Sequence, residues 1–243
     1  MISSERDLPL YNGRPVEIEG IGWLFLMASV MIAFLALIFI PMRSFPYNIV
    51  PALLFAAIPL MVLRRAAGSC WKCLFRPINR QSLALMVLFG LITFIGSLAT
   101  GWMLQRYFEL RPNPMSDAFA TMSTVKIGET FVVTCIQLLG EELLGILPFL
   151  GILWFCVRRL HMARTPGIVI ALIMSGLLFG AAHLPTYDWH WAQSLIGIGV
   201  TRTLLTLAFI ATRNIWVSTG AHIINDWTGL VLAIGLGHFP INP

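Results

Sequence analysis

Three short sets of polar residues interrupt the apolar C-terminal half of the chain, and their types and spacing could support hydrolysis of a peptide bond. They are Glu141 with Glu142, Phe179 with His183, and His222 with Asn225 and Asp226. Residues three or four apart lie on the same face of a helix, so His222 shares a face with both Asn225 and Asp226. Ionisable side chains are rare in apolar stretches of membrane length, so each one is a candidate functional residue.

The chemistry that these groups suggest is hydrolysis by an activated water molecule. A carboxylate such as Glu141 can take a proton from water as a general base. An imidazole beside an amide or a carboxylate can donate a hydrogen bond to the oxyanion that develops on an attacked carbonyl. No Ser or Cys is spaced from the histidines in a way that indicates a covalent nucleophile, so direct attack by water is the simpler interpretation.

The same residue types could also bind a metal. Glu141, His183 and His222 are suitable side chains for a catalytic zinc site with three protein ligands. The HExxH pattern of many zinc proteases is absent from the sequence. The residues therefore leave two sources of the nucleophile open, water on a zinc ion and water activated by a carboxylate alone, and the pattern requires no cofactor.

These residues must be positioned by helices that cross a membrane. Of the 243 residues, 58% are hydrophobic and 11% are charged, less than half of the roughly 25% that is usual for soluble domains. A helix needs about 20 apolar residues to cross a bilayer core, and a span must be helical because lipid offers the backbone no hydrogen bonds. We therefore predict an all-α, polytopic bundle of transmembrane helices. Its spans are residues 21–41, 47–63, 83–104, 127–157, 167–183, 192–211 and 215–237.

The number of spans depends on the fourth stretch, residues 127–157. This stretch is too long for one straight span, so it forms either one long tilted helix or two pieces that are broken near Gly140 or Pro148. The bundle accordingly has seven or eight spans. Residues 1–20 form a polar leader without the apolar core of a signal peptide, and residues 21–243 form a single transmembrane domain.

Basic residues cluster in two of the predicted loops. One cluster, between the second and third spans, consists of Arg64, Arg65, Lys72, Arg76 and Arg80, and the other, after the fourth span, of Arg158, Arg159 and Arg164. The positive-inside tendency places both loops, and with them the N-terminus, in the cytoplasm. We expect a multi-pass membrane protein, in the plasma membrane if the source is bacterial. The net charge of +5 then reflects topology and contact with lipid headgroups, and no nucleic-acid partner is expected.

Together the three sets resemble the motifs of the CAAX protease and bacteriocin-processing (CPBP) family of membrane proteases, which includes the type II CAAX prenyl endopeptidases. The family pattern is EExxxR, then FxxxH, then HxxxN or HxxxD, on successive membrane helices. Glu141 begins the first motif, Phe179 to His183 fits the second, and His222 to Asp226 fits the third. The resemblance covers about residues 128–236.

The resemblance implies an intramembrane endopeptidase and a role for each residue. Glu141 would activate the hydrolytic water, and His183 would hold or polarise that water or bind a metal. His222, with Asp226 or Asn225, would stabilise the oxyanion. The substrate would be a membrane-associated peptide or protein, either prenylated as in CAAX processing or, in a bacterium, a peptide that is processed. Nothing in the sequence predicts the oligomeric state.

One departure from the family pattern concerns its arginine. Ile146 stands where the arginine of the first motif is expected, so Glu142, which would tune Glu141, lacks a local cation and is expected to be protonated. An unpaired guanidinium within a span is unfavourable. We therefore hypothesise that Arg202, in the sixth span, pairs with Glu142 or Asp226. The alternative is a catalytically inactive relative that acts as a membrane scaffold, an immunity protein or a regulator.

The depth of the two histidines is a further question. His183 ends the fifth span, whereas His222 lies nearer the middle of the seventh. A shared site requires either a tilted fifth span or a re-entrant segment at residues 184–192. Tyr187, within that segment, is expected to lie at the membrane interface. A small transporter with a polar relay is a third functional class, and it is disfavoured because the sequence shows no inverted repeat.

Overall fold

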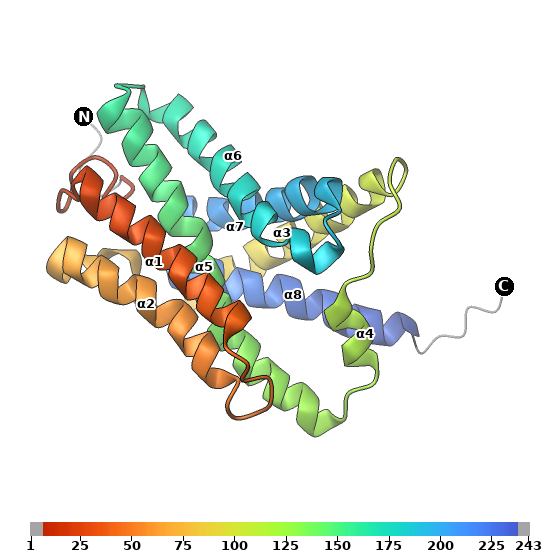
Figure 1. Ribbon diagram of the computed structural model, residues 1–243. Helices are drawn as coiled ribbons and strands as arrows, with labels where there is room; N and C mark the ends of the chain where they lie inside the picture. Colours follow the sequence, from red (N-terminus) through yellow and green to blue (C-terminus); the bar gives the residue numbers. More distant parts are fainter. Residues whose placement is uncertain (1–6, 238–243) are drawn as a thin grey trace.

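The computed structural model describes residues 7–237, and these residues form a bundle of helices without a β-strand (Figure 1). Short 3-10 or π-helical segments extend or connect some of the α-helices. The α-helices are α1 (Gly20–Phe39), α2 (Ile49–Ala67), α3 (Arg80–Leu104), α4 (Pro114–Ala120), α5 (Thr124–Trp154), α6 (Arg164–Ala182), α7 (Gly199–Thr212) and α8 (Ile215–Gly237). The predicted all-α class is therefore confirmed.

Within the described residues, six helical segments are long and apolar enough to cross a membrane. They are Gly20–Phe39, Ile49–Leu74, Arg80–Leu104, Thr124–Arg159, Arg164–Ala182 and Ala192–Thr212. These segments correspond to the first six predicted spans, and the seventh prediction coincides with α8, which is not among the six. The fourth stretch is one continuous helix through Gly140 and Pro148, so it is not broken into two pieces.

Helix α5 runs through the interior of the bundle and carries the first candidate set. Of its most apolar window of 18 residues, 72% is buried, against 17% to 33% in the other five segments. Helices α1 and α2 pack against each other, and α2, α6, α7 and α8 all contact α5, whereas α3 packs on α7 and α8. A polar side chain on the buried part of α5 must therefore find its partner inside the protein.

Two glycines bring α6 and α7 close together. A Cβ atom at Gly176 would lie 2.9 Å from the carbonyl oxygen of Gly199, closer than Cβ atoms approach in real structures. The two backbones can meet because neither residue has a side chain. Three residues further along each helix, the guanidinium carbon of Arg202 lies 5.3 Å from the centre of the Phe179 ring. The close contact thus sets the second candidate set beside Arg202.

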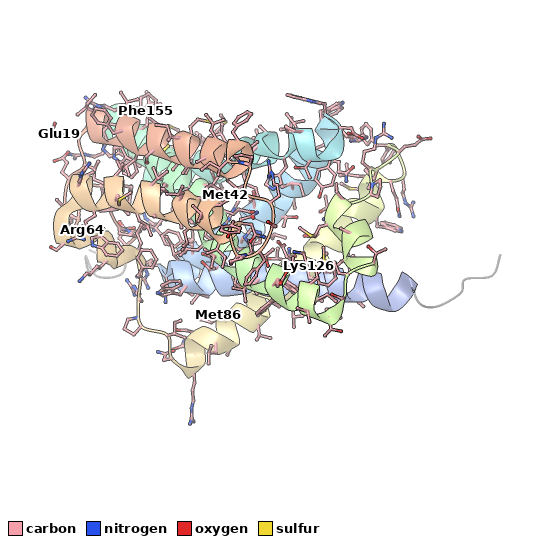
Figure 2. The ribbon with its side chains drawn as sticks, turned by 60° about the horizontal axis from the view of Figure 1, so that its bottom comes forward. Glu19, Met42, Arg64, Met86, Lys126 and Phe155 are labelled. Carbon is pink, nitrogen blue, oxygen red and sulfur yellow. The ribbon has the colours of Figure 1, made fainter. Side chains whose placement is uncertain are left out.

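The two basic loops lie at the same end of the bundle. Figure 2 shows Glu19, Arg64 and Phe155 toward one end of the molecule and Lys126 toward the other. An ion pair of 2.7 Å joins Arg158, which follows α5, to Glu17, which precedes α1. The N-terminal segment and both basic loops therefore share one end, as the predicted topology requires.

The predicted polar leader packs more closely than its composition suggests. Residues 1–6 lie outside the described residues. Leu8, Leu10 and Tyr11 are buried and join the apolar core of α1, α2 and α5. Asp7 accepts a hydrogen bond of 2.6 Å from the Tyr11 hydroxyl and forms an ion pair of 2.9 Å with Arg164. This segment therefore covers the basic end of the bundle.

Candidate active site

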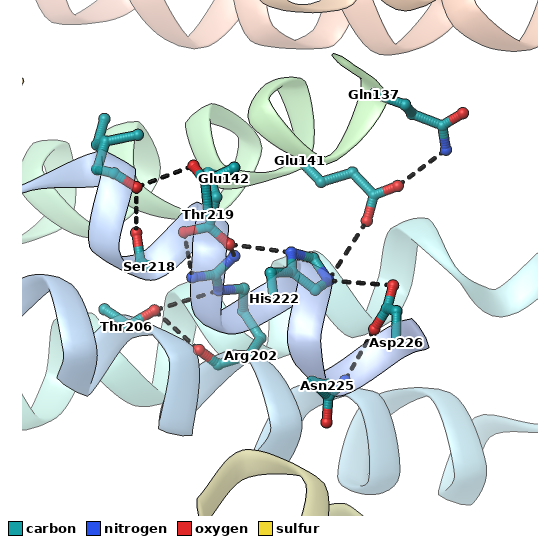
Figure 3. Close-up of polar contacts among 11 residues, drawn as sticks. Gln137, Glu141, Glu142, Arg202, Thr206, Ser218, Thr219, His222, Asn225 and Asp226 are labelled. Carbon is teal, nitrogen blue, oxygen red and sulfur yellow. Dashed lines mark hydrogen bonds and ion pairs between the residues drawn. The ribbon is translucent and has the colours of Figure 1, made fainter. Parts of the chain in front are cut away.

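The two adjacent glutamates of α5 have different environments because successive residues of a helix point about 100° apart. The side chain of Glu142 is fully buried, whereas that of Glu141 is 13% exposed and lines a cavity. Figure 3 shows them on either side of the His222 ring, with Glu141 toward Gln137 and Glu142 toward Arg202. One carboxylate is therefore structural and the other is open to a reactant.

Glu142 forms a two-pronged ion pair with Arg202 of α7. Arg202 Nη1 donates to Glu142 Oε1 at 2.7 Å, and Nη2 donates to Oε2 at 3.0 Å. Arg202 Nε donates to the Thr206 hydroxyl at 3.3 Å. The hypothesis that Arg202 pairs with an acidic residue of the site is confirmed, with Glu142 as the partner. The expectation of a protonated Glu142 is wrong, because this geometry joins a guanidinium to a carboxylate.

The place of the missing motif arginine is apolar. Ile146 is fully buried and belongs to the hydrophobic core of α1, α2 and α5. Beside it, Gly145 leaves room for the cation that comes from α7, since a Cβ at position 145 would lie 2.8 Å from Arg202 Cδ and Nε. The positive charge that the motif places at position 146 is therefore supplied here by Arg202 of α7.

His222 is held between three carboxylates. Its Nδ1 lies 3.0 Å from Glu142 Oε1, and its Nε2 lies 3.9 Å from Glu141 Oε2 and 3.7 Å from Asp226 Oδ2. A proton on Nδ1 donates to Glu142, which fixes the plane of the ring and directs Nε2 toward the cavity. The ion pair with Arg202 thus orients His222 through Glu142.

Asp226 is in turn oriented by its neighbour Asn225. Asn225 Nδ2 donates to Asp226 Oδ1 at 2.8 Å, which leaves Oδ2 directed at His222. The amide oxygen of Asn225 is buried and has no hydrogen-bond partner among the described residues. Both residues of the third set therefore lie at the site, with Asp226 facing the imidazole and Asn225 supporting it.

His183 reaches the same cavity from the C-terminal end of α6. Its Nδ1 lies 2.9 Å from the carbonyl oxygen of Phe179, so a proton on Nδ1 donates to the backbone and Nε2 is left for other partners. The Phe179 ring centre lies 4.7 Å from the His183 ring centre and 6.4 Å from the His222 ring centre. The two histidines therefore flank one phenylalanine, although they come from different positions along their helices.

A cavity of about 470 Å³ connects these groups. Its walls include Glu141, His183, His222, Asn225 and Asp226. A second cavity of about 350 Å³ has mostly apolar walls, including side chains of α1 and α2, and shares Gln137, Glu141, His183 and Thr186 with the first. Glu141 and His183 thus lie where the two cavities meet.

Two cavity residues do not belong to the three sets. Gln137, one helical turn before Glu141, donates from Nε2 to Glu141 Oε1 at 2.9 Å, a position that its spacing from Glu141 indicates. Tyr187 lines the cavity and is only 7% exposed, so its side chain faces the interior of the protein. Burial raises the pKa of Tyr187, and the carboxylates of Asp226 and Glu141 raise it further. Its hydroxyl therefore remains a hydrogen-bond donor at neutral pH.

The three side chains considered as zinc ligands share the cavity without forming a metal-binding set. Among the described residues, no group of three His, Cys, Asp or Glu side chains is arranged to hold a metal ion. This geometry does not fit a zinc site made by Glu141, His183 and His222.

A comparison with protein families agrees with the motifs. Residues 124–228 match the family described as type II CAAX prenyl endopeptidase Rce1-like. The matched segment begins with α5, ends within α8 and contains all three candidate sets, close to the predicted range of 128–236. Comparisons with curated proteins and with solved structures gave no match. Residues 124–228 therefore match the Rce1-like type II CAAX prenyl endopeptidase family, which confirms the resemblance drawn from the motifs.

Proposed function

We propose that the protein is an intramembrane endopeptidase in which Glu141 activates water to hydrolyse a peptide bond. The observation that carries the proposal is the place of Glu141 Oε2. It faces His222 Nε2 at 3.9 Å in the cavity, while Oε1 is held by Gln137. A general base needs a free oxygen beside the reacting atoms, and an oxyanion needs a donor nearby. Both groups border the same space.

The proposed reaction begins when Glu141 removes a proton from water and the water oxygen bonds to the substrate carbonyl carbon. The carbonyl oxygen becomes an oxyanion and accepts a hydrogen bond from Nε2 of His222, whose imidazolium form also donates from Nδ1 to Glu142. His183, with its proton on Nδ1, accepts a hydrogen bond from the attacking water at Nε2. The intermediate collapses as the C–N bond breaks, and Glu141 gives its proton to the leaving nitrogen. Asp226 and Glu142 keep His222 in place, and Arg202 keeps Glu142 in place.

The inactive alternative depends on Ile146, which in place of the motif arginine would leave Glu142 without a cation. Arg202 supplies that cation through two hydrogen bonds to the carboxylate. The substitution at position 146 is therefore compatible with a charged and ordered site.

The test compares cleavage of membrane-tethered peptides by purified wild-type protein and by Glu141→Gln, each with and without a chelator. Glu129→Gln is a matched control, because Glu129 is on the same helix but pairs with Lys126 and does not line the cavity. We expect Glu141→Gln to lose about 10²-fold or more in activity, with no effect of the control or the chelator. Full activity in Glu141→Gln would contradict the mechanism, and loss with chelator alone would indicate a metal.

A further inference from the structure

The catalytic cavity has a polar wall made by extramembrane connections. Asn113, Met115 and Ser116 belong to the connection between α3 and α5, and Thr186 and Tyr187 to the connection between α6 and α7. These connections follow the C-terminal ends of α3 and α6 and precede the N-terminal end of α5. Arg111 links them, since its backbone N–H donates to the Gln193 side chain at 2.8 Å. The cavity therefore reaches the end of the bundle where these connections lie.

The basic loops lie at the other end. The leader and the connections α2–α3, α5–α6 and α7–α8, with the helix ends beside them, are at that end. From residue 7 onward, they carry ten Lys and Arg residues and three acidic residues. The connections at the cavity end, with the helix ends beside them, carry four Lys and Arg residues and four acidic residues. Short loops rich in Lys and Arg stay in the cytoplasm, so this asymmetry places the cavity end on the opposite side.

Aromatic side chains show the level of the membrane surface at the cavity end. Trp102, Tyr107, Trp189 and Trp191 are exposed there, and Trp and Tyr collect at the interface between lipid and water. The same connection that exposes Trp189 also provides Tyr187 to the cavity wall. A substrate would therefore enter close to the membrane surface.

The charges around the cavity also restrict the substrate. The described lining residues include the carboxylates of Glu141 and Asp226 and two histidines, but no Lys or Arg. A substrate with its own carboxylate beside the scissile bond would find no permanent cation, and it would face two acidic groups at short range. An internal peptide bond avoids this repulsion.

We infer that the protein cleaves internal peptide bonds of membrane-tethered chains on the non-cytoplasmic side of the membrane, close to its surface. This inference rests on the proposed proteolytic function and goes further, since it states the side of access and the class of substrate.

The experiment uses sealed membrane vesicles from an expression host, prepared right-side-out and inside-out, with an impermeant fluorogenic peptide that carries a lipid anchor and an amidated C-terminus. We expect cleavage in right-side-out vesicles and none in inside-out vesicles until detergent opens them. Cleavage that favours inside-out vesicles, or is equal in both, would overturn the inference while the proteolytic function stands. No cleavage after detergent, where Glu141→Gln serves as the blank, would instead be a failure of the proteolytic function.

Two controls complete the test. Glu109→Cys at the cavity end and Ser69→Cys at the basic end are both exposed, and an impermeant maleimide reports the side of each in a Cys70→Ser, Cys73→Ser background. We expect Glu109→Cys to react from outside and Ser69→Cys only from inside; the reverse pattern overturns the inference. A second peptide with a free carboxylate three residues after the scissile bond should be cleaved at least about tenfold more slowly, and equal rates would contradict the charge argument.

Discussion

Arg202 on α7 and Glu142 on α5, 60 residues apart in the sequence, form a two-pronged ion pair with both side chains fully buried. This pair connects two helices and also orients His222, which bonds the same carboxylate at 3.0 Å. A buried charge is tolerated only when it is paired and hydrogen-bonded. The pair is therefore both a structural contact and the base on which the imidazole of the site is held.

Replacing Arg202 should destabilise the protein more than replacing a surface cation. Arg202→Leu leaves the Glu142 carboxylate buried without its partner, which typically destabilises a protein by about 3–5 kcal/mol. Arg158→Leu breaks only the exposed pair with Glu17, which is worth about 1 kcal/mol or less. Thermal unfolding of the purified variants in detergent measures both. Equal losses in stability from the two substitutions would mean that the buried pair stabilises the protein no more than the exposed pair does.

Adding Ile146→Arg to Arg202→Leu should not restore stability, because position 146 lies in the apolar core.

The space left by Gly145 should matter for the same pair. In Gly145→Ala, the new methyl group would lie 2.8 Å from Arg202 Cδ, and the resulting displacement should destabilise the protein by about 1–3 kcal/mol. Gly128→Ala on the same helix is the matched control, since no atom beyond its own stretch of helix lies within 4 Å of its Cβ position. Alanine favours a helix over glycine by about 1 kcal/mol, so the control should unfold at the same or a higher temperature. An unfolding temperature of Gly145→Ala equal to or above that of Gly128→Ala would contradict the prediction.

Gln137 should act as a positioning residue for Glu141. Gln137→Leu removes the donor to Glu141 Oε1, and a hydrogen bond to a charged group contributes about 1.5–3 kcal/mol. We expect kcat to fall by about tenfold or more with little change in KM or in the unfolding temperature. Gln137→Glu should be worse, because it sets a second carboxylate against Glu141. A variant that changes KM alone would show that Gln137 contacts the substrate instead.

Tyr187 should contribute a neutral donor in the cavity. Its pKa is raised above the ordinary value of 10.0 by burial and by the nearby carboxylates, so the hydroxyl keeps its proton at neutral and moderately alkaline pH. We expect Tyr187→Phe to lower kcat, with a ratio of wild type to variant that is constant near pH 7 and declines only above pH 10. Tyr107→Phe, which is exposed and outside the cavity, should behave as wild type. An unchanged rate in Tyr187→Phe would remove the residue from the site.

The N-terminal segment should depend on the ionised form of Asp7. Burial acts to raise the pKa of Asp7, but hydrogen bonds from Tyr11, the Leu8 backbone and Arg164 lower it below its ordinary value of 3.8. The stabilisation from Asp7 is therefore present above pH 3.8 and lost as the pH falls through the lowered value. Asp7→Asn should lower the free energy of unfolding by about 1 kcal/mol at pH 7 and make no difference in strong acid. Tyr11, whose pKa is raised to about 12, stays protonated throughout. Thermal unfolding at both pH values provides the comparison, and a difference that persists in acid would contradict the role of the Asp7 charge.

The sequence by itself determined the fold class of the protein, the first six spans and the residues of the candidate site. Hydropathy over 20 residues is a local property, so the first six predicted spans each correspond to an observed apolar helix. Because a charge in lipid is unfavourable, the sequence indicated Glu141, His183 and His222 as candidate functional residues and a partner for Arg202. The order of the motifs led to the family that the comparison shows.

Only the tertiary structure decided how these groups meet. It chose Glu142 over Asp226 as the partner of Arg202, set Ile146 in the apolar core and buried Tyr187 in the cavity wall. It also packed Leu10 of the polar leader into the core. Each of these outcomes depends on the rotation and the crossing of helices that are distant in the sequence. Local patterns show which face of a helix is polar, but contacts such as those at Gly145 and Gly176 determine which polar faces come together.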